Sequence, residues 1–246
     1  MASATVRVAA SDQARVRDAL ARYFDRNIST EWAGDDLLIK AIGKAAHGST
    51  PFAGDSAVTR IFRLVLAISS VGHEEFYEAL LNLANPSGEG LGIHGLDSVT
   101  GLLSSNLGIA DGNNGSLTFL LNIRYNIDTS GDALLERARA KVAKIGGEVE
   151  LVGDSAPLYF PTDHPLVRTI VEVYSQETGE AKEPGSMGGG TYARALKNAV
   201  AIGTGWMGDG PAHQADERIA VASLVKAAKI YAILLYRLAM LAGRAA

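Results

Sequence analysis

The sequence contains no cysteine among its 246 residues. This absence excludes disulfide frameworks, thiolate metal sites and cysteine nucleophiles, so a metal ion would need His, Asp or Glu ligands. Basic residues are also few: 23 Lys and Arg stand against 27 Asp and Glu, the net charge is -4, and no basic block occurs. We therefore expect no nucleic-acid partner, because phosphate neutralisation requires clustered cations.

A long apolar run is missing as well. The longest, residues 230–241, is interrupted by Arg237 and is shorter than the roughly 20 apolar residues that a membrane-spanning helix needs. Residues 1–10 lack the basic and then apolar pattern of a signal peptide. A cytoplasmic protein with no membrane partner is therefore expected. The composition, 47% apolar and 20% charged, is that of a globular chain.

Strand and helix patterns alternate through the first 155 residues. The expected strands are Ala4–Ala9, Asp35–Gly43, Leu107–Ala110, Ser116–Arg124 and Glu148–Val152. The expected helices cover residues 16–24, 61–68, 73–83 and 132–145. The third and fourth strands flank a turn rich in Gly and Asn, which favours a hairpin. This order predicts an α/β sandwich with helices on one face.

The pattern changes after Gly153, where three prolines occur within nine residues. We place a boundary there, which gives domains 1–155 and 156–246. The second domain is expected to contain helices over residues 165–174 and 221–241, a helix opening at Thr191 and a strand at Ala199–Gly203. About 90 residues is small for an independent α/β domain, so this part is expected to need a partner surface.

Histidine is the informative residue type in a chain without cysteine. His47 follows a strand among small neighbours, and His213 lies in a polar loop before the final helix, so both are candidates for chemistry rather than turn residues. His94, three residues before Asp97 in a glycine-rich loop, is a candidate for a metal or hydrogen-bonding role.

Arg124 alternates out of an otherwise apolar strand. A guanidinium fixed on a strand can hold a carboxylate through two parallel hydrogen bonds. The alternative is a surface charge on the solvated face of the sheet.

The segment GSMGGGTYAR has a weak likeness to an anion-binding loop, because it lacks the lysine of a phosphate loop. Gly188, Gly189 and Gly190 instead imply close approach of the backbone to a bound group. Thr191 would open a helix, with Arg194 one turn along it.

Four motifs in order, GKAAHGSTPFAGDSA, NIRYN, GGGTYARAL and AHQADERI, resemble one family. They are similar to the PepV-type dipeptidases of the zinc metallopeptidase family that also contains aminoacylase, carboxypeptidase G and succinyl-diaminopimelate desuccinylase. The likeness runs through almost the whole chain but covers only the second half of such an enzyme. It implies that residues 1–155 correspond to the lid domain and residues 156–246 to the C-terminal part of the catalytic domain.

The resemblance also implies roles for individual residues. His47 would polarise the scissile carbonyl and stabilise the oxyanion, and Arg124 would hold the terminal carboxylate of a small-molecule substrate. Gly188 to Gly190, Thr191 and Arg194 would line the substrate pocket. His213 would be a zinc ligand.

Other features of the family are not matched: its H-x-D metal motif, its bridging Asp and its Glu-Glu pair have no counterpart here. One zinc ligand of the family type cannot hold a dinuclear site. The sequence therefore predicts a dipeptidase-derived metallohydrolase, repurposed through a recruited zinc site, with His94 a further ligand candidate. Such a site would suit activated esters or phosphotriesters, and a homodimer would cover the apolar face left bare. The alternative is an inert fragment that serves as a dimerisation or partner-binding module.

Overall fold

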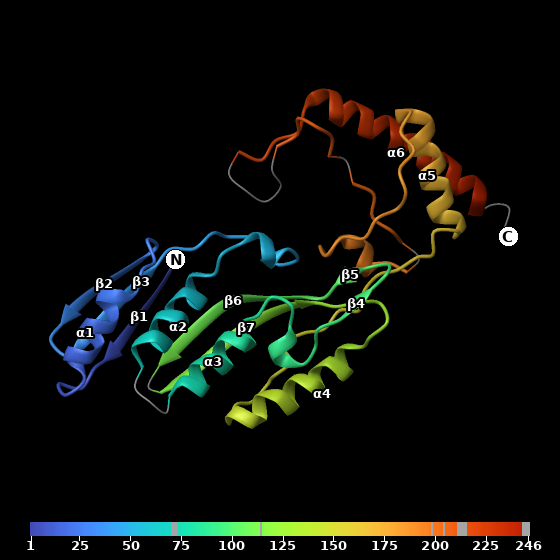
Figure 1. The fold of residues 1–246 in the computed structure, drawn as a ribbon. Coiled ribbons are helices and arrows are strands. Elements are labelled where there is room, and N and C mark those ends of the chain that lie inside the picture. The colour runs from blue at the N-terminus through green and yellow to red at the C-terminus, as the bar shows by residue number, and fades with distance from the viewer. Residues whose placement is uncertain (70–72, 114, 198, 204, 211–215, 243–246) are drawn as a thin grey trace. The chain divides into compact units, whose positions relative to one another are not determined.

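The computed structural model describes residues 1–69, 73–113, 115–197, 199–203, 205–210 and 216–242. The chain forms two compact units, Met1–Pro157 and Leu158–Ala246 (Figure 1). Helices and small antiparallel sheets make up the described residues, which confirms the predicted α/β class. None of the helices in these residues is long and apolar enough to cross a membrane.

The first unit begins with a three-stranded antiparallel sheet in the order β1-β3-β2. Its strands are β1 (Ala2–Arg7), β2 (Ile28–Ala33) and β3 (Asp36–Ala41). Leu37, Ile39 and Ala41 alternate along the central strand and are fully buried. They pack with apolar side chains of α1 (Gln13–Arg22) and α2 (Ala57–Ile68), which form the first core of the unit.

A second core lies under a hairpin made by β6 (Ser104–Asn113) and β7 (Ser116–Arg124). Helices α3 (Glu74–Leu83) and α4 (Gly131–Val142) run alongside the hairpin (Figure 1). Phe119, Leu121 and Ile123 of β7 pack against buried residues of these helices. Because side chains alternate across a strand, the even-numbered residues of β7 occupy the opposite face of the hairpin.

The first unit also contains several short elements. They are η1 (Pro51–Ala53), η2 (Glu89–Leu91), β4 (Leu96–Asp97), β5 (Gly101–Leu102) and η3 (Ala143–Ile145). Phe62 of α2 contacts Phe119 of β7, with ring centroids 5.7 Å apart. This contact joins the first core to the second.

The described residues of the second unit form the helices α5 (Pro165–Thr178) and α6 (Val221–Ala242) and a short 3-10 turn, η4 (Tyr192–Ala195). Its buried core consists of Val173, Ile230 and Leu234, with partly buried residues around them. The two helices are further linked by an ion pair between Glu177 and Lys229, whose charged atoms lie 2.6 Å apart.

Three details of the sequence prediction are wrong. Residues 148–152 and 199–203 form no strand. In each case a helix side chain bonds a carbonyl that a strand would offer to its neighbour: Arg139 donates to Val149 and the Tyr231 hydroxyl donates to Ile202. The segment after Thr191 makes only the 3-10 turn η4 and not an α-helix.

Candidate substrate-binding site

His47 lies on a loop that is closed at its base by a backbone bridge. Lys44 and Asp55 exchange two N–H···O hydrogen bonds, both 2.9 Å long. Inside the loop, the Thr50 backbone N–H donates to the His47 carbonyl at 2.8 Å. The loop is therefore an ordered projection from the end of β3.

The His47 ring is oriented by Ser49. The Ser49 backbone N–H donates to His47 Nδ1 at 3.3 Å, and the Ser49 hydroxyl lies 2.7 Å from the same nitrogen. A backbone N–H can only donate, so Nδ1 accepts and we assign the proton of the neutral ring to Nε2. The exposed ring thus offers an N–H donor to a carbonyl oxygen.

Arg124 ends strand β7 and pairs with Ser104 of β6. It lies on the face opposite to Ile123, away from the second core. Its Nε is buried and makes no hydrogen bond within the described part of the chain. An unsatisfied buried donor costs about 1–3 kcal/mol, and a carboxylate that bonds the guanidinium would remove this cost.

The loop of His47 lies against the hairpin face that carries Arg124. A Cβ placed on Gly48 would be 3.7 Å from Asn122 Oδ1 and 3.9 Å from Asn106 Nδ2. Asn122 shares the face of Arg124 and lies two residues, about 6–7 Å, along the strand.

Asn106 and Asn122 are functional candidates that sequence reasoning missed. They are register partners in the hairpin, so both amides flank the loop of His47. A signal was present, since Asn is depleted in strands and two of them in one predicted hairpin require a reason. Each amide can donate and accept, which suits a peptide group.

The other pocket residues predicted from the sequence lie in the second unit. Gly188 to Gly190 form a loop before η4, and Thr191 caps η4 by accepting a hydrogen bond from the Ala193 backbone N–H at 3.3 Å. A Cβ on Gly190 would lie 3.6 Å from Arg194 Nη1. The guanidinium of Arg194 therefore rests against the glycine loop, and these residues form one local group.

The two predicted metal ligands do not form a site within the part of the chain that the structure describes. His213 lies outside them, and His94 is exposed after η2. Asp97 accepts hydrogen bonds from the backbone N–H groups of Val99 and Thr100, at 2.6 and 2.5 Å, and from the Thr100 hydroxyl. These bonds lower the pKa of Asp97 to about 2. Its carboxylate thus holds a turn, and no group of three His, Asp or Glu side chains lies together in the ranges that the structure describes.

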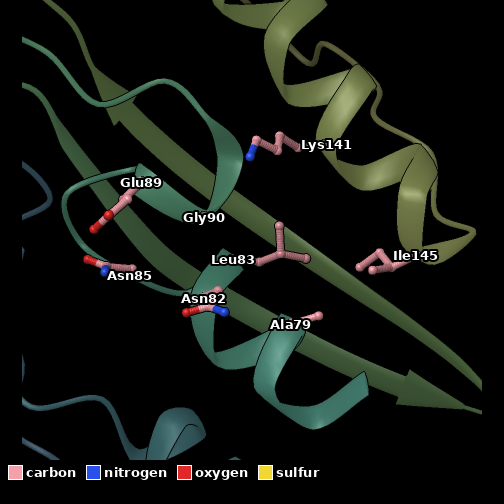
Figure 2. A pocket seen from close by; sticks show the side chains of 8 residues that line it. All are labelled: Ala79, Asn82, Leu83, Asn85, Glu89, Gly90, Lys141 and Ile145. Atoms are coloured by element: carbon pink, nitrogen blue, oxygen red, sulfur yellow. The ribbon is translucent and has the colours of Figure 1, made fainter. Parts of the chain in front are cut away.

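A cavity of about 380 Å³ lies on the helix side of the hairpin, where Leu83 belongs both to its wall and to the second core. Figure 2 shows its lining side chains on α3, η2, α4 and η3. They include the ammonium of Lys141, the carboxylate of Glu89 and the amides of Asn82 and Asn85. The cavity contains none of the predicted site residues.

Comparison with known proteins places these observations in a family. The model of peptidase family M20/M25/M40 matches residues 18–237. A protein of Staphylococcus saprophyticus named "Putative dipeptidase" is 31% identical over 209 residues, which are 82% of this chain and 44% of that protein. Equally named proteins of Staphylococcus epidermidis and Staphylococcus aureus strain USA300 are 29% and 30% identical over 208 residues, with the same coverage.

The chain spans less than half the length of the curated relatives that it matches. The match of the family model nevertheless extends over most of the chain and through both units. The chain belongs to peptidase family M20/M25/M40.

Proposed function

We propose that this chain provides the substrate-binding part of a metal-dependent dipeptidase-type hydrolase. The observation that carries the proposal is the approach of Gly48 to Asn106 and Asn122, which lie within 4 Å of the place that a Cβ on Gly48 would take, so that the loop of His47 lies near the face of Arg124. In this proposal residues 1–155 form a lid-like domain, and residues 156–246 belong to the catalytic domain. The names of the relatives support a dipeptide as substrate.

Arg124 and His47 would bind the groups at the two ends of the C-terminal residue of the dipeptide. Arg124 would bind the C-terminal carboxylate, because its buried Nε lacks an acceptor in the described part of the chain. His47 Nε2–H would donate to the scissile carbonyl oxygen and stabilise the negative charge that develops there. The amides of Asn106 and Asn122 would bind the peptide group between them.

Zinc would supply an activated water for hydrolysis. The described residues do not fit a zinc centre by themselves, since no three ligands converge among them. His213 and His94 remain the proposed ligands that this chain would add.

The binding experiment compares a dipeptide with its C-terminal amide in calorimetric titrations of the purified chain. Replacing Arg124 with Met should weaken dipeptide binding about 10- to 100-fold, because a hydrogen-bonded charge contributes about 1.5–3 kcal/mol. The amide should bind the wild type and Arg124→Met equally. Arg137→Met is the matched control, since Arg137 is exposed on α4. Equal binding of the acid by wild type and Arg124→Met would refute the proposal.

The catalytic part of the proposal is tested by elemental analysis with turnover of a dipeptide, an aryl ester and an aryl phosphotriester before and after chelation. About one zinc or more per chain with chelator-sensitive turnover supports a metallohydrolase. Turnover of the activated ester or phosphotriester without peptide hydrolysis would identify a repurposed site. Absence of both zinc and turnover contradicts the catalytic part.

A second candidate is a homodimer-forming or partner-binding module without catalysis. The observation that favours it is the apolar surface of α6, where Val221 is 78%, Leu235 71% and Tyr236 67% exposed. Contiguous exposed apolar side chains are typical of interaction surfaces. Sedimentation equilibrium of wild type and Leu235→Ser distinguishes this candidate, which predicts a dimer that the substitution dissociates.

A further inference from the structure

The two ends of the loop of His47 are linked by one arginine, Arg60, which bonds Asp55 directly and reaches the other end through Asp25. Arg60 lies in the first turn of α2, and its side chain is only 16% exposed. Its Nη2 bonds the carboxylate of Asp55, and its Nη1 bonds the carboxylate of Asp25. The two aspartates come from segments 30 residues apart, so the guanidinium ties these segments together.

Asp55 is the C-terminal end of the loop. Its backbone makes both hydrogen bonds of the bridge with Lys44. The approach is close, because a Cβ on Gly43 would lie 2.2 Å from the Asp55 carbonyl oxygen and 2.7 Å from the Ala57 nitrogen. A displacement of Asp55 would therefore lengthen or break the two hydrogen bonds of the bridge.

Asp25 reaches the N-terminal end of the loop through a turn. Its carboxylate accepts a hydrogen bond from the Asn27 backbone N–H at 2.9 Å, and the Asn27 carbonyl accepts from the Ile42 N–H at 2.8 Å. Ile42 lies two residues before Lys44, the first residue of the bridge. The pKa of Asp25 lies below its ordinary value, first because of the Asn27 N–H and then because of Arg60. The ionised carboxylate is thus the form that the turn and the guanidinium hold.

We propose that Arg60 is a positioning residue for His47, which fixes both ends of the loop so that the imidazole stays beside the hairpin face of Arg124. This inference rests on the proposed function for its consequence in substrate binding. The planar fork of an arginine suits the task, since it bonds two carboxylates at once, whereas a lysine ammonium on a flexible stem cannot hold the same geometry.

The first readout is the His47 ring itself, which is independent of any ligand. Nitrogen-15 NMR of the histidine side chains separates the two neutral tautomers, and His47→Ala assigns the signals of His47. In the wild type we expect the Nε2–H form. Arg60→Lys should mix the tautomers, because the Ser49 N–H would no longer be held against Nδ1. Arg63→Lys, on the exposed side of the same helix, should leave the signals unchanged.

The second readout is a double-mutant cycle on dipeptide affinity. Arg60→Lys should weaken binding roughly two- to tenfold, about as much as His47→Ala, since each removes one hydrogen bond to the substrate carbonyl. In the His47→Ala background, Arg60→Lys should have no further effect. Asp55→Asn provides a milder variant in case Arg60→Lys folds poorly.

The outcomes separate this inference from the proposed function. Unchanged His47 signals in both Arg60→Lys and Asp55→Asn overturn it, and so does an equal loss of affinity with and without His47. If the wild type binds no dipeptide, the proposed function fails while the NMR signals still decide whether Arg60 positions His47.

Discussion

The two units of the chain differ in how much of their apolar surface they bury. In the first unit, Leu37 and Ile39 are 0% exposed under two helices. In the second, the buried apolar side chains among the described residues are fewer, namely Val167, Val173, Ala227, Ile230 and Leu234, and Leu235 and Tyr236 of α6 remain 71% and 67% exposed. A unit with its own core can hold a site to within fractions of an ångström, because packed interiors do not deform continuously. In the first unit, the loop of His47 approaches the face of the hairpin that carries Arg124.

The largest effect is expected in the core of the first unit. Ile39→Ala should lower the free energy of unfolding by about 3 kcal/mol, because it leaves a cavity in a packed core. Ile42→Ala, three residues along and 61% exposed, should change it by less than about 0.5 kcal/mol. Urea denaturation is followed by Trp32 fluorescence in a Trp206→Phe background, so that the signal reports this unit alone. Equal effects of the two substitutions would mean that β3 is not the centre of the core.

The contrast between the two units also explains which helices and strands could be predicted from the sequence. The alternation in Asp36–Ala41 and the helical spacing in Ala57–Ile68 predicted elements that are present, because these residues are buried on one face. Strand β2, ISTEWA, was missed because its polar residues are mostly exposed. Strands were wrongly predicted at residues 148–152 and 199–203, where no residue is buried. A sequence pattern cannot show whether another strand lies beside a segment.

The site was predicted less completely than the fold. His47 and Arg124 were singled out one at a time, from a loop motif and from a charge in an apolar strand. The approach of the loop of His47 to the hairpin of Arg124 is seen at Gly48, Asn106 and Asn122, which meet only when the loop after β3 folds onto a hairpin some 60 residues later. Spacing in the sequence carries no record of such a contact. Whether these residues act as predicted stays open to the binding experiments above.

A smaller effect is expected in the second unit. Leu234→Ala should lower the free energy of unfolding by about 2 kcal/mol, at the low end for buried Leu, because a thin core relaxes around the cavity. Leu235→Ala, next in the helix and exposed, is the matched control. Trp206 fluorescence in a Trp32→Phe background reports this unit. If Leu234→Ala also shifts the Trp32 transition in the Trp206→Phe background, the two units do not unfold independently.

The smallest effect is expected at acidic pH, where protonation of one carboxylate in each unit should lower the stability of the fold. Asp97 has a pKa of about 2, lowered first by the Thr100 hydroxyl and then by backbone N–H groups. The pKa of Asp209 is also lowered, first by the Ala220 N–H and then by the Trp206 N–H, which donate at 2.8 and 2.9 Å. A carboxyl whose pKa is lower in the folded state stabilises the fold above its unfolded pKa of about 3.9. This stabilisation is lost as the pH falls toward the folded pKa.

The stability difference between wild type and Asp97→Asn should therefore be constant from about pH 5 to 7 and shrink as the pH falls from about 4 to 2. The stability difference between wild type and Asp209→Asn should change with pH in the same direction. Trp206 fluorescence reports the unfolding of Asp209→Asn, and Trp32 fluorescence reports that of Asp97→Asn. Asp128→Asn, exposed on the turn after β7, is the control substitution. A difference that grows on acidification would reverse the sign required by linkage. A response of Trp206 to Asp97→Asn would instead show that the two units share their stability, and the contrast drawn from their cores would then fail.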